Sequence, residues 1–314
     1  MTLPDNLRSL GNVRRPHDRR RSGAPGPVAF VFQGGGSLAA PQVGMLVALT
    51  QAGVRPDLVI GSSAGALNAV AFASDPGLAG LGRLELVWMS LRRRRIAPFS
   101  VRAALAAVAG RGDGLVSNSA LRALIESAAV AGTLGGTAIA AHVVATDLAS
   151  GAPVVFSAGE TVPALLASCA FPGLYPPVAV GERLLVDGGV SADVPVLQAE
   201  ALGARVTYVL PSAACGTELP HGPLPHGPLP LACHALSQLL EVAARGDVAA
   251  SRGLVHVLPA PGSRATSPVD FRDTARLIDE GYRLAAGWLD RHVMQAGAGP
   301  GTGVFPAPAS ASAI

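Results

Sequence analysis

A serine between two glycines is the first candidate for chemistry in this sequence. Ser63 stands at the centre of Gly61-Ser62-Ser63-Ala64-Gly65, directly after an apolar run typical of a buried strand. A serine hydroxyl is a weak nucleophile unless a base removes its proton and the backbone exposes it. A tight strand-to-helix turn of the Gly-x-Ser-x-Gly type exposes it, because larger residues at Gly61 and Gly65 would collide. The sequence therefore predicts Ser63 as a nucleophile in a turn formed by Gly61 and Gly65.

Three consecutive glycines are the second candidate feature. Gly34, Gly35 and Gly36 follow the strand predicted over residues 27–32. Residues without a Cβ let successive backbone N–H groups point at one spot, where they can bind the oxyanion of a tetrahedral intermediate. A glycine triplet can equally cradle a nucleotide phosphate. A nucleotide site is less favoured, because the sequence has neither the Gly-Lys-Ser/Thr of a P-loop nor the spacing of a dinucleotide fingerprint.

An aspartate at the end of a predicted strand is the candidate base. Asp187 follows the strand predicted over residues 183–186 and precedes two glycines, which let the backbone turn back toward a ligand. Sites in α/β folds are built at strand ends, so we expect the Asp187 carboxylate at the same sheet edge as Ser63. The alternative is a Ser-Asp-His order, for which three downstream histidines are candidates: His234, His256 and His292. No motif surrounds any of the three.

The elements that must position these residues alternate between strand and helix. Short apolar runs predict strands at residues 27–32, 57–60, 142–146, 154–156, 183–186 and 206–210. Helical periodicity predicts helices at residues 42–51, 64–73, 81–91 and, with Ser267 as N-cap, from 267 to about 293. This alternation predicts an α/β fold in which helices cover both faces of a mainly parallel central sheet, giving three layers.

Composition and charge suggest how the chain is divided. Charged residues make up 14% of the 314 residues, against about 25% in an average domain, so much of the chain should be buried. Every basic residue is arginine, and six arginines lie within the first 21 residues. We expect a disordered Arg-rich leader over residues 1–26 and one domain over 27–295, with a Pro-rich loop over 211–231. A disordered Ala/Gly/Pro tail should follow over 296–314.

The sequence favours a cytoplasmic protein. The leader lacks the apolar core of a secretory signal, and the uncharged run 127–141 is too short and too weakly hydrophobic for a membrane span. Three widely separated cysteines, Cys169, Cys215 and Cys233, form neither a disulfide framework nor a zinc pattern. The arginines of residues 92–95 favour a solvated helix end, with peripheral contact with the phosphate headgroups of a membrane as the alternative.

The motifs as a set resemble the patatin-like phospholipase family, in which a Ser-Asp dyad hydrolyses lipid acyl esters without a catalytic histidine. The likeness runs through most of residues 27–290. It is carried by Phe-Gln-Gly-Gly-Gly-Ser-Leu (32–38), Gly-Ser-Ser-Ala-Gly-Ala-Leu-Asn-Ala (61–69), Ala-Thr-Asp-Leu-Ala-Ser-Gly (145–151), Ala-Ser-Cys-Ala-Phe-Pro-Gly-Leu-Tyr-Pro-Pro-Val (167–178), Val-Asp-Gly-Gly-Val (186–190) and Gly-Tyr-Arg-Leu-Ala (281–285).

The resemblance implies a role for each motif. Ser63 would be the nucleophile, Asp187 the base, and the N–H groups of Gly35 and Gly36 the oxyanion hole. The substrate would be a lipid or another acyl ester, and we expect no metal, cofactor or nucleic-acid partner. Many family members have Arg or Lys followed by Gly after the triplet, where this chain has Leu38-Ala39. This departure puts phospholipid headgroup preference in doubt. It also motivates the alternative of a catalytically silent scaffold that binds acyl chains or a partner protein.

Overall fold

The computed structural model describes residues 26–92, 114, 116–128, 130–214, 228–263 and 269–293. Several features predicted from the sequence lie outside these residues. They are the leader except Gly26, the tail over 296–314, the arginines at 93–95, most of the Pro-rich loop, and Ser267.

An eight-stranded sheet forms the centre of the fold, in the order β5-β6-β3-β2-β1-β7-β8, with β4 also paired to β3. The strands are β1 Val28–Phe32, β2 Leu58–Ser62, β3 Ala140–Asp147, β4 Pro153–Phe156, β5 Val178–Val180, β6 Arg183–Asp187, β7 Val206–Leu210 and β8 Leu254–Val257. The five neighbours β3, β2, β1, β7 and β8 are parallel. The predicted α/β fold with a mainly parallel central sheet is therefore confirmed.

One side of the sheet departs from the parallel arrangement. β4 and β6 both pair antiparallel to β3, and β5 pairs antiparallel to β6. The connections explain two of these three pairings, because β3 reaches β4, and β5 reaches β6, through short turns that cannot carry a parallel crossover. The sequence did not predict β5 or β8, which have only three and four residues.

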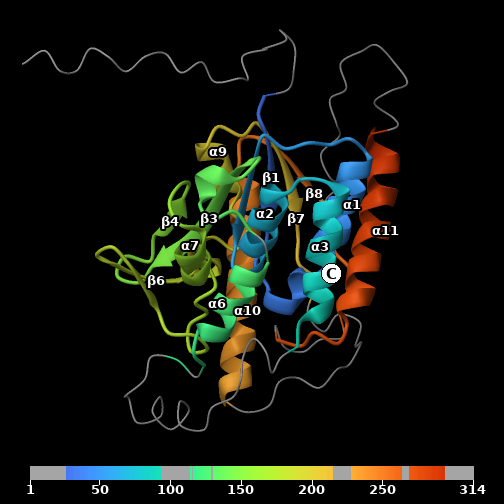
Figure 1. The fold of residues 1–314 in the computed structure, drawn as a ribbon. Helices are drawn as coiled ribbons and strands as arrows, with labels where there is room; N and C mark the ends of the chain where they lie inside the picture. The colour runs from blue at the N-terminus through green and yellow to red at the C-terminus, as the bar shows by residue number, and fades with distance from the viewer. Residues whose placement is uncertain are drawn as a thin grey trace, which may run out of the picture.

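Helices cover both faces of the sheet (Figure 1). One face carries α1 Pro41–Gln51, α2 Ala64–Ser74, α3 Leu78–Ser90, α6 Ser119–Ser127, α7 Thr161–Ser168 and α11 Thr274–Val293. The other carries α8 Gly189–Ala192, α9 Val196–Ala201 and α10 Pro228–Ala250. Alternate side chains of each strand serve the two layers: Phe30 and Phe32 join the larger core, and Ala29 and Val31 join the smaller one.

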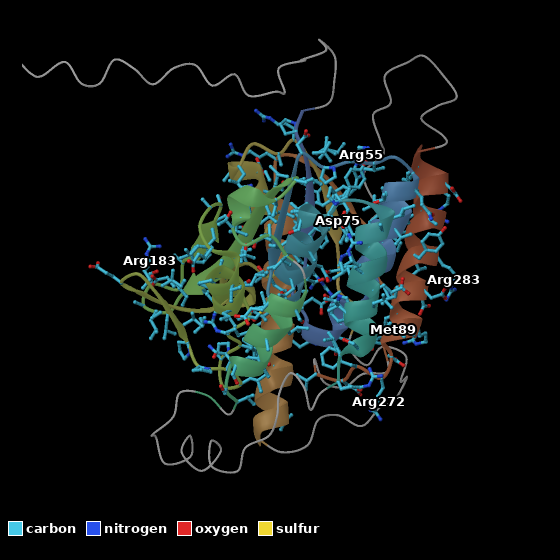
Figure 2. All side chains as sticks on the ribbon, in the orientation of Figure 1. Arg55, Asp75, Met89, Arg183, Arg272 and Arg283 are labelled. Carbon is cyan, nitrogen blue, oxygen red and sulfur yellow. The ribbon has the colours of Figure 1, made fainter. Side chains whose placement is uncertain are left out.

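Charged side chains lie around the outside of these layers. The labelled Arg55, Arg183, Arg272 and Arg283 all point away from the ribbon (Figure 2). Within the described ranges, no helix combines the length and the apolar character that a membrane crossing requires. The low share of charged residues fits this arrangement, because both helical layers pack their apolar faces onto the sheet.

Two helix starts differ from the prediction. α10 begins at Pro228, inside the segment predicted as a loop over 211–231. The first turn of a helix accepts proline because its N–H groups have no intrahelical acceptor, which the loop prediction overlooked. α11 begins at Thr274 rather than at Ser267. Just before it, an ion pair of 2.6 Å joins Arg272 to Asp270 in a turn.

Two glycines allow α1 and α11 to pack closely. A Cβ added at Gly44 of α1 would lie 2.6 Å from the backbone nitrogen of Tyr282, and one added at Gly281 of α11 would lie 2.8 Å from Cβ of Pro41. Real Cβ atoms do not approach other atoms so closely, so either substitution has to push the two helices apart. This contact holds the C-terminal helix against the start of α1, just after the glycine triplet.

We expect Gly281→Ala to lower the free energy of unfolding by about 1–3 kcal/mol, because the methyl group meets the backbone of α1. Gly287→Ala is the matched control on the same helix, since its nearest neighbour would be the Arg291 side chain at 3.6 Å. The control should be neutral or stabilising by up to about 1 kcal/mol. Urea unfolding followed by circular dichroism compares the two, and equal midpoints would contradict this account of the helix contact.

Candidate active site

Ser63 and Asp187 come together because β2 and β6 share one edge of β3. The last pair of β2 joins Ser62 to Val144, and the last residue of β6, Asp187, lies opposite the next residue of β3, Ala145. β4 pairs with residues 143–146 of β3, a stretch that overlaps those paired with β2 and with β6. β4 must therefore lie on the opposite edge of β3 from these two strands. The carboxyl ends of β2 and β6 therefore meet head to head. Ser63 follows one of these ends and Asp187 forms the other.

The backbone at Ser63 has a conformation that non-glycine residues rarely adopt. Its φ is 52° and its ψ is −128°. Among the described non-glycine residues, Ser63 alone has a positive φ. The turn is closed so tightly that a Cβ at Gly61 would lie 2.6 Å from the carbonyl carbon of Gly65. A Cβ at Gly65 would lie 2.6 Å from the carbonyl oxygen of Phe32. Both glycine positions therefore exclude a side chain.

Hydrogen bonds hold the serine and the aspartate in a defined geometry. Ser63 Oγ donates to Oδ2 of Asp187 at 2.6 Å, and the N–H of Gly189 donates to Oδ1 at 2.8 Å. The N–H of Ser63 donates to Oγ of Ser168 at 2.9 Å. Each carboxylate oxygen thus has a donor, and one of the two donors is the hydroxyl of the candidate nucleophile.

Burial changes the acidity of Asp187. The side chain is only 3% exposed, and desolvation raises its pKa from 3.8 to about 7. The hydrogen bonds from Ser63 and Gly189 act in the opposite direction and lower this pKa, while the charge of Asp193 raises it. A carboxylate whose pKa is close to neutrality can accept a proton and return it near pH 7, which is the task of a general base.

The glycine triplet lies beside this pair. A Cβ at Gly34 would be 3.5 Å from Cβ of Ser63. Gly34 donates its own N–H to the carbonyl oxygen of Asp193 at 3.1 Å, so this N–H is not available to an oxyanion. The N–H groups of Gly35 and Gly36 have no acceptor within the part of the chain that the structure describes. The three predicted donors are therefore reduced to two, at residues with φ of 140° and 59°.

A chain of amide side chains supports the triplet from the core. Gln42 donates to the carbonyl oxygen of Gln33 at 2.8 Å, Asn68 donates to Oε1 of Gln42 at 2.8 Å, and Trp88 donates to Oδ1 of Asn68 at 2.7 Å. Gln42 and Asn68 are fully buried. Sequence reasoning did not assign these residues a role. The sequence did carry a signal for such a role: Gln42 and Asn68 are amide residues among the apolar residues of α1 and α2, the helices that follow the triplet and Ser63.

Two further ionisable groups adjoin the pair and were not predicted. Asp193, six residues after Asp187, accepts a hydrogen bond from Nε2 of Gln33 at 2.9 Å, and burial raises the pKa of Asp193. Cys169, the residue after α7, is buried; burial and the charge of Asp187 raise the pKa of this thiol, and a hydrogen bond with Ser63 lowers it. Cys169 lies within the motif over residues 167–178, but its residue type alone gave no reason to place it beside Asp187.

Two of the three candidate histidines lie away from the pair. The strand register puts His256 level with Val59 of β2 and three strands away, which is about 14 Å at ordinary strand spacing. Its ring lies 5.6 Å from Trp288, against which His292 stacks at 4.3 Å. The side chain of His234 lies outside the described residues. In the described ranges, no three His, Cys, Asp or Glu side chains form a group that could hold a metal ion.

Comparisons with known proteins identify relatives of this chain. A family model described as patatin-like phospholipase matches residues 30–200. An uncharacterized NTE family protein of Mycobacterium tuberculosis H37Rv, Rv2565, is 32% identical over 170 residues, covering 54% of this chain and 27% of the relative. The lysophospholipase nte1 of Aspergillus terreus is 24% identical over 208 residues, covering 62% of this chain and 12% of the relative. The chain thus spans about a quarter of the mycobacterial relative's length and less of the fungal one.

A solved structure also resembles the chain. The crystal structure of VipD from Legionella pneumophila aligns with a TM-score of 0.43 and 15% sequence identity, covering 86% of this chain and 67% of that one.

The strained backbone at Ser63 has a measurable consequence. We expect Ser63→Gly to be more stable than Ser63→Ala by about 1 kcal/mol, because glycine relieves a strain of about 1–3 kcal/mol and gives back part of it in the unfolded chain. Both variants lose the same hydroxyl, so the difference isolates the backbone. Urea midpoints measure it. At Ser90 in α3 the order should reverse, since alanine is favoured in a helix; the same order at both sites would refute the strain.

Proposed function

The chain belongs to the patatin-like phospholipase family, and we propose that it is a serine acyl hydrolase that cleaves lipid acyl esters with a Ser63–Asp187 dyad. The observation that carries the proposal is the 2.6 Å hydrogen bond from Ser63 Oγ to a buried carboxylate whose pKa is raised to about 7. Its setting also supports the proposal: Ser63 lies in a strained strand-to-helix turn, and within the described residues the nearby N–H groups of Gly35 and Gly36 have no acceptor, as acyl transfer would require.

In the first half of the proposed reaction, Asp187 takes the proton of the Ser63 hydroxyl while Oγ attacks the ester carbonyl. The N–H groups of Gly35 and Gly36 receive the oxygen as its negative charge develops. Because these donors are already held in place, they need no reorganisation when the charge appears. Asp187 then passes the proton to the leaving alcohol, and the acyl group stays on Ser63.

In the second half, water replaces the alcohol. Asp187 accepts a proton from the water, the resulting hydroxide attacks the acyl carbon, and the same two N–H groups stabilise the second oxyanion. The proton returns to Ser63 Oγ as the fatty acid leaves. No step in this scheme requires a metal or cofactor. A single carboxyl group therefore acts as base and acid in turn, which a pKa close to the working pH favours.

The position that is basic in many family members is apolar and buried in this chain. Leu38, which replaces the basic residue found in many family members, is 8% exposed and belongs to the main core. Its N–H donates to the carbonyl oxygen of Gly35 at 3.1 Å, and its carbonyl oxygen accepts from Ala213 at 2.8 Å. We propose that substrate selection here rests on the apolar acyl part, with phospholipids and other fatty-acyl esters as the candidate substrates and no nucleic acid as partner.

The remaining assignments are proposals of the same kind. We propose that residues 27–295 form the hydrolase domain, between an Arg-rich leader and an Ala/Gly/Pro tail. We also propose that the protein acts in the cytoplasm with peripheral contact at a membrane, where its lipid substrates would be found.

Ser63→Ala should abolish ester turnover while leaving the fold intact. We expect kcat/KM for a nitrophenyl fatty-acyl ester to fall by about 10³-fold or more, and a fluorophosphonate probe should label wild-type Ser63 alone. Mass spectrometry of the labelled peptide identifies the site. If the folded wild type neither turns over nor labels between pH 6 and 9, the chain is the catalytically silent scaffold instead.

The pH profile should report the ionisation of Asp187. Because the base must be deprotonated, kcat/KM should fall about tenfold per pH unit below about pH 7 and level off above it. Asp187→Asn should lose about 10³- to 10⁴-fold above pH 7, where the wild-type carboxylate is ionised, and its profile should lack the inflection near pH 7. His256→Ala and His292→Ala serve as controls, since both rings pack against Trp288 and not against Asp187. Loss of activity in either control would favour a triad over the dyad.

A further inference from the structure

Asp193 contacts the glycine triplet with its backbone, and it contacts Gln33, the residue before the triplet, with its side chain. Its carbonyl oxygen accepts the N–H of Gly34 at 3.1 Å, and its carboxylate accepts from Nε2 of Gln33 at 2.9 Å. Oε1 of the same glutamine accepts the N–H of Ser212 at 3.0 Å, and the Ser212 hydroxyl donates to the carbonyl oxygen of Gly34. Both polar groups of Gly34 are therefore held from outside the loop, one of them by Asp193.

The Asp193 carboxylate also lies close to the candidate base. A Cβ built on Gly189 would be 3.1 Å from Oδ1 of Asp187 and 3.1 Å from Oδ1 of Asp193, so these two oxygens are no more than twice that distance apart. A Cβ built on Gly34 would be 2.5 Å from Oδ1 of Asp193 and 3.5 Å from Cβ of Ser63. The Asp193 carboxylate thus lies close to the glycine triplet, to Ser63 and to Asp187.

We propose that Asp193 is a positioning residue of the site, which fixes the glycine triplet through Gln33 and Gly34 and adds a second negative charge beside Asp187. The proposal rests on the dyad proposed above. Through the first role it keeps the N–H groups of Gly35 and Gly36 directed at the carbonyl carbon that Ser63 attacks. Through the second role it makes Asp187 hold a proton more firmly, because a like charge within about 6 Å opposes ionisation.

The ionisable neighbours of the two carboxyl groups are acids. Cys169 follows α7 and interacts with Asp187, and Glu241 of α10 interacts with Asp193. Among the described residues, hydrogen bonds to the two carboxyl groups come from Ser63, Gly189, Gln33 and the backbone of Gly34. The Asp193 charge raises the pKa of Asp187, and the charge of Glu241 raises the pKa of Asp193. Removing the charge at residue 193 should therefore make Asp187 a stronger acid.

Asp193→Asn tests the charge, because asparagine keeps the shape and an oxygen that can accept from Gln33. We expect the pKa of Asp187 to fall by about 0.5–1 unit, measured by carbon-13 NMR titration of aspartate-labelled protein. Asp187→Asn assigns the resonance. Glu241→Gln is the matched control: it removes a more distant, exposed charge and should move this pKa by less than about 0.2 unit. An Asp193→Asn shift as small as the control's would overturn the electrostatic role.

Asp193→Ala tests the positioning role, since it removes the acceptor as well as the charge. We expect kcat for a nitrophenyl ester at pH 8 to fall by about 10²-fold while KM changes little, and Asp193→Asn to lose much less. An alanine variant that keeps wild-type kcat would overturn this role. The NMR titration requires no turnover, so it decides the electrostatic role even if the wild type proves inactive. Inactivity of the wild type would refute the proposed function and, with it, the positioning role.

Discussion

The site depends on two strands sharing one edge of β3. β3 has eight residues; the first five pair with β2, and the last three with β6. Because β6 runs antiparallel and pairs with so short a stretch, its carboxyl end stops where β2 ends. An antiparallel strand that paired along the whole of β3 would place its last residue at the opposite end of the sheet. The short pairing of β6 is therefore what puts Asp187 beside Ser63.

The rest of the site follows from this meeting point. Gly188, which follows Asp187, has no room for a side chain, because a Cβ there would collide with the carbonyl oxygen of Val144 on β3. α8 begins immediately afterwards, and Ser62 donates to the carbonyl oxygen of Ala192 at 2.5 Å, which ties this helix to the end of β2. Asp193 follows directly and reaches the glycine triplet. Asp187, the proposed base, and Asp193, the proposed positioning residue, are thus only six residues apart in the sequence.

The sequence predicted what is local and missed what depends on long-range pairing. The strand before Ser63, the helix after it and the tight glycine turn are encoded within a few residues, so their prediction needed no knowledge of the fold. The antiparallel direction of β6 is not encoded in that way. The position of Asp187 at a strand end led to the expectation that it shares a sheet edge with Ser63, but it did not predict that β6 runs antiparallel to β3. Gln33, Gln42 and Asn68 were missed for the same reason, since each acquires its partner only when separate elements pack.

In the proposed mechanism, the use of an aspartate as base in place of histidine links catalysis to stability. An ordinary aspartate would be too acidic to take a serine proton efficiently near neutral pH, and burial corrects this by raising the pKa of Asp187 from 3.8 to about 7. A change of this size corresponds to about 4 kcal/mol. Since the folded state holds the proton more firmly than the unfolded state, this contribution is complete below about pH 4 and is lost as the pH rises toward 7. The proposed enzyme is thus least stabilised by this residue in the pH range where the base is ionised and ready to act.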